Sequence, residues 1–194
     1  VYANRILAAN DAALSHIQRP EAEGLVRLGT PDDYATYLLP QVLAGITKDH
    51  PRLQFEVTCD NASDLLPMLE RGDLDVVVAT HPLSAVAGQI ARHEPLHWVA
   101  SPHYVDDPKT PLSLVLFPSG CVCRDIALDA LRQIVMEASI IPPSLKIIDG
   151  QPGFPALPEV VISVHQSSTG EPHVSLVADN LLSKLGYVAK QKAS

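Results

Sequence analysis

The chain has 194 residues, enough for one ordinary domain or for two small lobes around continuous cores. Its formal net charge of −8 weighs against extended contact with nucleic-acid phosphates, because such contact depends on clustered lysine and arginine. No apolar run approaches the roughly 18 residues of a membrane span and no signal sequence opens the chain, so we expect a cytoplasmic protein without a membrane partner. The odd number of cysteines favours reduced thiols.

The first predicted elements are a helix and a buried strand. Residues 1–18 are rich in alanine and carry one apolar stripe at helical spacing, which ends at Arg19 and Pro20. The stretch "GLVRLGT", residues 24–30, then predicts a short strand that ends at Thr30. Its apolar residues do not alternate cleanly, as expected of a strand that is buried on both faces.

Residues 32–48 predict an amphipathic helix, because apolar residues recur at every fourth position from Tyr34 to Ile46. Thr30 is a natural N-cap and Pro31 a natural first helical residue, which gives this helix a start signal. Pro40 lies inside the pattern, and we expect it to kink the helix.

A second strand, a second helix and a third strand follow in "RLQFEVTCD", "NASDLLPMLERGDLD" and "DVVVAT". Strands that alternate with helices predict a parallel sheet, and such sheets bind ligands at the carboxyl ends of their strands. Those ends should meet at one rim and bring together the polar residues Thr30, Asn61, Thr80 and His81. The helix N-terminus after Thr30 suits a carboxylate, but plain capping is the alternative, since Asp32 and Asp33 already supply negative charge there.

A second unit begins after "EPLHWVASPHY", which reads as an extended connector. The stretch "LSLVLFPSGCVCRDIALDALRQ" predicts a strand, a tight turn and another helix. Ser119, Gly120 and the backbone N–H groups near Cys121 are expected to face the rim of the first unit, which would make a ligand cleft between two lobes. A helix cap with a tight turn and no ligand is the alternative interpretation.

Three patterns that resemble catalytic or metal sites are rejected. "HEPLH" fits the zinc-protease pattern, but Pro95 and the extended context take His93 and His97 out of helical register. Cys121 and Cys123 form a CxC pair without a second pair of ligands, which favours a buried turn over a soft-metal site. Ser119 has no GxSxG surroundings and no identifiable base. We therefore expect no catalytic residue, metal or cofactor.

The order of several segments resembles the effector-binding domain of the LysR-type transcriptional regulators. "YANRILAANDAAL" resembles the end of the family's linker helix, and "GLVRLGTPDDYATYLLPQVLAGITKDHPRLQFEV" its first strand, helix and second strand. "LLPMLERGDLDVVVAT", "EPLHWVASPHY", "LVLFPSGCVCRDIALDAL" and "LPEVVISVH" look like later segments. Together they cover most of the chain.

This resemblance implies an α/β fold with two Rossmann-like lobes of the periplasmic-binding-protein type, joined by crossing hinge strands. It implies a linker-helix end at 1–20, a first lobe at 24–100 and 163–190, and a second lobe at 101–162. A small-molecule effector would bind between the lobes, and the family's winged helix-turn-helix, which precedes the linker helix, would contact DNA. It also implies a homodimer or homotetramer in which the helix at 32–48 pairs with the helix at 126–133 of another copy.

The chain departs from the family pattern after Ser139, where about one βα unit is missing before the proline-rich return. Either the protein lacks this unit, or the printed chain joins segments that are not contiguous in the natural protein. We favour the second explanation, because a second lobe without its crossover helix would expose a sheet face.

Three classes of protein remain: a regulator's sensor domain, a secreted solute-binding protein of similar fold, and a small hydrolase. The missing signal sequence, the odd cysteine count and the linker helix favour the sensor domain, and the lack of a catalytic constellation disfavours the hydrolase. The polar rim suits a small organic acid, while Asp32 and Asp33 leave room for a cationic or hydroxylated effector.

Overall fold

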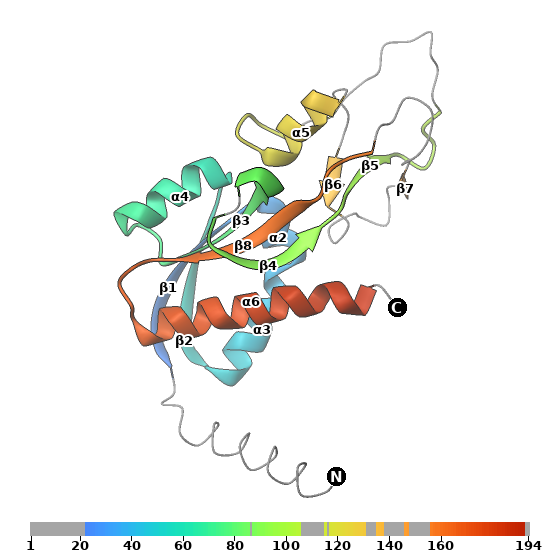
Figure 1. Cartoon of the computed structure of the whole chain (residues 1–194). Helices are drawn as coiled ribbons and strands as arrows, with labels where there is room; N and C mark the ends of the chain where they lie inside the picture. Colours follow the sequence, from blue (N-terminus) through green and yellow to red (C-terminus); the bar gives the residue numbers. More distant parts are fainter. Residues whose placement is uncertain are drawn as a thin grey trace, which may run out of the picture.

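The computed structural model describes residues 22–85, 87–105, 115, 117–130, 135–137, 146–147 and 156–192, with 135–137, 146–147 and 187–192 described by backbone alone. Its elements form two α/β lobes, a larger one around a five-stranded sheet and a smaller one around a three-stranded sheet (Figure 1). The predicted two-lobed α/β fold is confirmed.

The sheet of the first lobe has the strand order β2-β1-β3-β8-β4. The parallel strands β1 (Glu23–Thr30), β2 (Arg52–Cys59) and β3 (Val76–Pro82) are the three that the sequence predicts. Two antiparallel strands extend this sheet: β8 (Val160–Gln166) pairs with β3, and β4 (Gln89–Glu94) pairs with β8.

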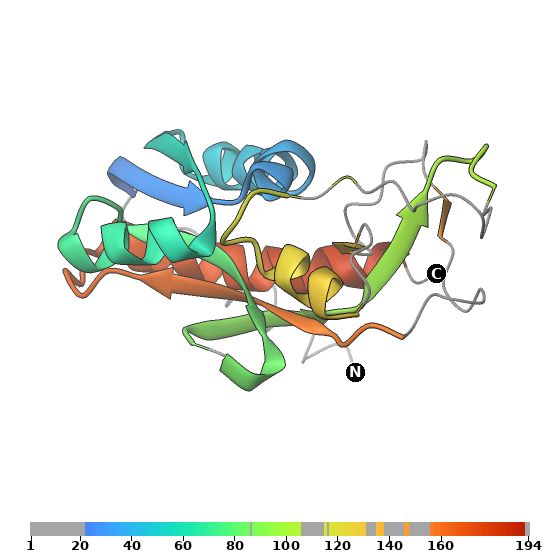
Figure 2. The same cartoon turned by 90° about the horizontal axis from the view of Figure 1, so that it is seen from above.

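Helices cover both faces of this sheet (Figure 2). The helices α3 (Leu39–Asp49) and α6 (Pro172–Lys192) pack on one face, and α4 (Ala62–Arg71) packs on the other. The short helix α2 (Asp32–Tyr37) joins β1 to α3, and a 3-10 turn, η1 (Leu83–Ala85), follows β3.

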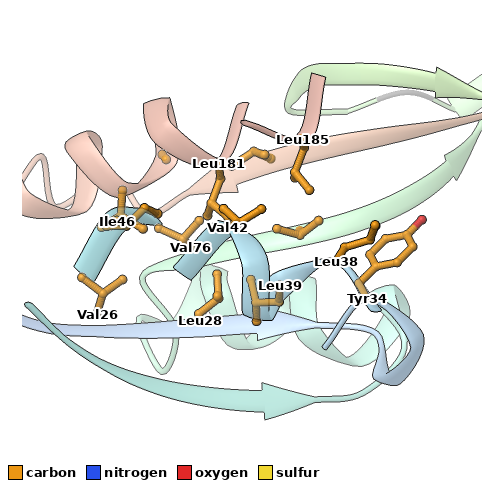
Figure 3. Close-up of a cluster of buried hydrophobic side chains, with 14 of the residues drawn as sticks. Val26, Leu28, Tyr34, Leu38, Leu39, Val42, Ile46, Val76, Leu181 and Leu185 are labelled. Carbon is orange, nitrogen blue, oxygen red and sulfur yellow. The ribbon is translucent and has the colours of Figure 1, made fainter. Parts of the chain in front are cut away.

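The main hydrophobic core lies between the sheet and the pair α3 and α6 (Figure 3). Alternate residues of the strands point into it, so that Val26, Leu28 and Val76 meet Val42 and Ile46 of α3. The opposite face of β3 packs on α4 in a smaller cluster made of Leu65, Leu74, Val77 and Ala79. Burial on both faces explains why β3 reads as a continuous apolar run, whereas β1, expected to be buried on both faces, leaves Leu25 42% exposed.

The second lobe contains a sheet of order β6-β5-β7 and one helix. Its strands are β5 (Leu96–Ala100), β6 (Val135–Glu137) and β7 (Lys146–Ile147), and α5 (Val122–Ala130) packs beside them. The stretch expected to be an extended connector is therefore a central strand. Its side chains Leu96, Trp98 and Ala100 form a separate core with Cys123 and Ala127 of α5.

Two chain segments connect the lobes. On the first segment, β4 runs into β5 with only Pro95 between them. On the second, Val160 at the start of β8 packs in the core of the second lobe, whereas Ile162 packs in the core of the first. The chain thus passes between the lobes at Pro95 on the first segment and within β8 on the second, which agrees with the predicted crossing strands (Figure 1).

Two details of the helix predicted over 32–48 are wrong: its continuity and its N-cap. The helix expected over 32–48 is two helices that meet at Leu38, with Pro40 in the first turn of α3, where a proline removes no helical hydrogen bond. Pro31, and not Thr30, is the N-cap of α2, and no side chain makes a cap hydrogen bond there. Thr30 instead ends β1.

Several sequence-based expectations lie outside the described residues. These are the linker helix at 1–20, most of the strand before Phe117, and the missing βα unit after Ser139. Within the part of the chain that is described, no helix is long and apolar enough to cross a membrane.

Candidate ligand-binding site

The carboxyl ends of the first-lobe strands border a cavity of about 270 Å³ that α5 of the second lobe closes on the other side. Thr30 and Cys59 are register partners at the ends of β1 and β2, and the Asp60 N–H donates to the Thr30 carbonyl at 3.3 Å. The cavity is lined by Pro31, Asp32, Asp33, Cys59, Asp60, Asn61, Ala62, Thr80, Phe117, Pro118, Gly120, Cys121, Val122 and Cys123.

Six of the nine residues predicted for the site line this cavity, namely Asp32, Asp33, Asn61, Thr80, Gly120 and Cys121. They come from the starts of α2, α4 and α5 and from the end of β3. Both lobes contribute to one cavity, as the strand-to-helix junctions of the sequence indicate. Thr30, His81 and Ser119 are not among its lining residues.

Thr30 is buried in the core at the end of β1 and does not line the cavity. It lies on the same face of the strand as Val26 and Leu28, and its side chain is fully buried. Its hydroxyl has no hydrogen-bond partner within the described part of the chain.

His81 follows Thr80 on β3, so its side chain points to the other face of the sheet. Its Nε2 atom lies 3.0 Å from Nε2 of His165 on β8, and the latter lies 2.9 Å from Oγ of Ser163. Burial lowers the pKa of His81. Burial and the neighbouring His81 together lower the pKa of His165 to about 4. This histidine pair is a separate cluster at the crossing strand.

Thr80 attaches α2 to the sheet. Its hydroxyl is hydrogen-bonded to the hydroxyl of Tyr34, which is almost completely buried beneath α2. The bond fixes the position of Asp32 and Asp33, because both precede Tyr34 in the same short helix. Sequence periodicity indicated a core role for Tyr34 but gave no sign of this polar contact.

The cavity is acidic. Asp32, Asp33 and Asp60 line it, and none of its lining residues in the described structure is lysine, arginine or histidine. Burial raises the pKa of Asp33, although its carboxylate accepts a hydrogen bond from the Tyr34 N–H at 2.9 Å. Burial and the nearby Asp32 raise the pKa of the Cys59 thiol. These carboxylates disfavour a purely anionic ligand.

Cys59, Asp60 and Cys123 line the cavity without having been chosen from the sequence. The strand-end rule covers Cys59, the last residue of β2, and Asp60, which follows it. Cys123 is the second residue of α5, and no pattern in the sequence shows on which side of the helix it lies. Among the described residues, no group of three or more His, Cys, Asp or Glu side chains is placed to hold a metal ion.

Gly120 brings the second lobe against the first across the cavity. It has a φ of +93°, and a Cβ atom built there would lie 2.8 Å from Ser63 Oγ on α4. A side chain at this position would therefore be strained by the positive φ, and the Ser63 hydroxyl would have to rotate away from it. The close approach explains why a glycine stands in the turn before α5.

Comparison with known proteins identifies the fold and the family. The sequence matches the family described as the LysR substrate binding domain over residues 19–142. It is 28% identical to the HTH-type transcriptional regulator DgdR of Burkholderia cepacia, covering 84% of this chain and 65% of that protein. It is 25% identical to the regulator PecT of Dickeya dadantii, covering 81% and 58%. The chain thus spans about three fifths of these relatives.

Solved structures show the same architecture. An OxyR2 regulatory domain from Vibrio vulnificus matches with a TM-score of 0.65 at 16% identity, covering 88% of this chain and 97% of that one. A reduced form of OxyR from N. meningitidis matches with a TM-score of 0.61 at 19% identity, covering 86% and 96%. These identities support the fold alone. The family match over more than half of the chain, on a two-lobed fold with a cavity at its strand ends, shows that this chain belongs to the LysR substrate-binding domain family.

Proposed function

We propose that this domain binds a small-molecule effector in the cavity between its lobes and that, in the full-length protein, this binding controls DNA binding and transcription. The observation that supports it most is that residues of both lobes line one cavity, including Asp33 and Thr80 on one side and Gly120 and Cys121 on the other. DNA contact belongs, in this proposal, to an N-terminal winged helix-turn-helix outside the present sequence. The relatives are named as HTH-type regulators, which supports a non-catalytic, cytoplasmic role.

The proposed mechanism is a shift in the relative placement of the lobes. A ligand that contacts both lobes binds one arrangement better than another, and it shifts the equilibrium only by that difference in affinity. The strands shared by the lobes, β4 with β5 and β8, would bend at the hinge. In the full-length protein this movement would change the spacing of the DNA-binding units.

A thermal-shift screen of metabolites tests whether the domain binds an effector. Two threonine variants then show whether the effector binds in this cavity. A ligand at about 100 times its dissociation constant adds about 2.7 kcal/mol to the free energy of unfolding. Thr80→Val removes a hydroxyl at the cavity. It should weaken the binding of a ligand found in the screen by about 1 kcal/mol or more. Thr30→Val is the matched control, because Thr30 is not among the lining residues.

The control substitution Thr30→Val also has an expected effect on stability. Because the Thr30 hydroxyl is fully buried without a partner in the described structure, valine should leave the fold intact or stabilise it slightly. Each variant's ligand-induced shift is compared with its own ligand-free melting temperature. Equal weakening in both variants, or unchanged affinity in Thr80→Val, would show that the effector does not bind in this cavity.

We also propose that the domain assembles as a homodimer or homotetramer. The family resemblance supports it, as does Tyr37, an aromatic side chain that is 47% exposed on α2. Sedimentation at micromolar concentration should give a dimer or larger species for the natural sequence, and Tyr37→Glu should favour the monomer by placing a charge at an apolar contact. Val105→Glu, at a more exposed position in the second lobe, serves as control. A monomeric natural sequence would contradict the proposal.

A further inference from the structure

All three cysteines of the chain line the same cavity, although they come from different elements. Cys59 is the last residue of β2, while Cys121 and Cys123 lie at the start of α5. Each is a free thiol, and the three differ in exposure: Cys59 is exposed, Cys121 is half-buried and Cys123 is buried. The cavity of the proposed effector site is therefore also the place where the chain gathers its nucleophilic side chains.

Cys121 occupies the N-cap position of α5. Its carbonyl accepts the first helical hydrogen bond, from the Asp125 N–H at 3.2 Å. Hydrogen bonding from the backbone N–H groups of Cys123 and Arg124, the second and third residues of the helix, acts to lower the pKa of its thiol. This is the arrangement by which serine or aspartate caps a helix, with a sulfur in place of the oxygen. A thiolate is better suited to it than a thiol, because it accepts hydrogen bonds more strongly and faces the positive end of the helix dipole.

The surroundings decide the charge of this sulfur. The Cys123 thiol donates a hydrogen bond to Cys121 and is the largest cause of a pKa lowered to about 7, with the two backbone N–H groups acting in the same direction. Burial and the carboxylate of Asp33 on α2 oppose this effect. Cys59 differs, since burial and Asp32 raise its pKa. At neutral pH we therefore expect the half-buried Cys121 to carry more thiolate than the exposed Cys59.

We propose that Cys121 is a covalent capture site for an uncharged, electrophilic ligand of the α,β-unsaturated carbonyl class that enters the cavity. The sulfur adds its electron pair to the β-carbon and forms a carbon–sulfur bond. The π electrons move to the α-carbon as an enolate, which takes a proton from water. No group leaves, and no oxidant or reductant is needed.

The lining of the cavity supports this class of ligand. Phe117, Pro118 and Val122 offer apolar contacts to a hydrocarbon portion. Asp32, Asp33 and Asp60 repel anions, which leaves an uncharged electrophile favoured over an acidic one. The volume of about 270 Å³ admits a compound of a few carbon atoms beside the sulfur. The assignment rests on the proposed function, in which this cavity is the ligand site.

The test compares the alkylation rates of the cysteines in the intact folded protein, with methyl vinyl ketone as the probe. Samples are quenched at intervals, and peptide mapping by tandem mass spectrometry assigns the adduct to each cysteine. Exposure alone would make Cys59 react first. A thiol with a pKa near 7 is about half ionised at pH 7, and after allowance for its lower intrinsic nucleophilicity we expect Cys121 to react about fivefold faster than Cys59.

Matched substitutions at Cys123 separate a chemical role from a structural one. Cys123→Ala removes the thiol donor and should move the half-maximal pH of Cys121 alkylation upward by about one unit. Cys123→Ser restores a hydroxyl donor and should return the profile toward that of the natural sequence. Cys121→Ser should abolish the fast adduct.

The inference is overturned if Cys59 reacts as fast as Cys121, or if the Cys121 rate follows a pKa near that of an ordinary thiol. It is also overturned if Cys123→Ala and Cys123→Ser have the same profile. None of these results would affect the proposed function, which is judged by the reversible ligand and the Thr80→Val variant. Conversely, selective alkylation of Cys121 with no reversible ligand detected would leave the capture site standing without the effector role.

Discussion

Replacing Trp98 by alanine should lower the free energy of unfolding by about 3–5 kcal/mol, the usual range for removal of a large buried aromatic side chain. Trp98 is 1% exposed and is the largest side chain in the core of the second lobe. It lies on β5 among Cys123 and Ala127 of α5 and Val160 of β8. A lobe with so small a core has few other side chains that can move to fill the space.

The effect should extend to the cavity, because the same core positions α5. Cys123 lies both in the Trp98 cluster and in the cavity lining. Urea unfolding followed by circular dichroism measures the loss, and the substitution should also abolish the thermal shift produced by any ligand. Val105→Ala, at a position that is 82% exposed, is the control and should change stability by no more than about 0.5 kcal/mol. A comparably small change for Trp98→Ala would mean that this lobe does not depend on the core described.

The sequence was most informative where local periodicity and burial agree. The parallel strands β1, β2 and β3 and the helices between them could be predicted, because each has a strong apolar pattern and short connections. The strand β4 could not be predicted, since its pairing with β8 joins residues about 70 positions apart and its pattern is broken by a register shift between Ile90 and Arg92. Trp98 was placed in a connector for the same reason: its partner strands β6 and β7 come much later in the chain.

The candidate site was predictable to the level of the backbone and not to that of the side chain. The rule that ligands bind at the carboxyl ends of parallel strands located the cavity and six of the nine residues. Thr30 lies on the same face of the sheet as Thr80, but its neighbours Leu28 and Gly29 pair with Val76 and Val77, so it is buried beside the first half of β3 and does not reach the cavity. His81 follows Thr80 by one position and points to the opposite face. The carboxyl end of a strand therefore predicts a lining residue only together with the register and the parity of that strand.

We expect the fold to be sensitive to acid because of the partly buried pair formed by His81 and His165. His165 has a folded-state pKa of about 4, below its ordinary value of 6.5, because of burial and the nearby His81. Its neutral form is thus favoured by folding. The stabilisation is fully present above pH 6.5 and is lost as the pH falls from 6.5 toward 4. Such a depression corresponds to about 3 kcal/mol at most, and partial exposure of the ring reduces it to about 2 kcal/mol.

Several groups face this pair and must be considered in the test. Ser163 of β8 contacts His165, Gly88 approaches its ring so closely that a Cβ would lie 2.7 Å from it, and Glu70 of α4 lines the adjoining groove. Asp75 titrates in a different window: burial alone would raise its pKa, but hydrogen bonds and charge from Arg27 lower it below 3.8. Its contribution therefore falls away below the range in which His165 acts.

Urea unfolding at pH 7, 5.5 and 4 of the natural sequence and of His165→Gln measures the contribution of the pair. The natural sequence should lose about 2 kcal/mol more than the variant over this range, because glutamine has no proton to bind. The same imidazole at an exposed site supplies the control: His93→Gln, where the side chain is 55% exposed, should keep the full acid dependence. Since β8 is shared by both lobes, protonation of His165 beside His81 places repulsion at the hinge itself. Parallel pH curves for the natural sequence and His165→Gln would assign the acid sensitivity to other groups and remove the pair from any role in lobe placement.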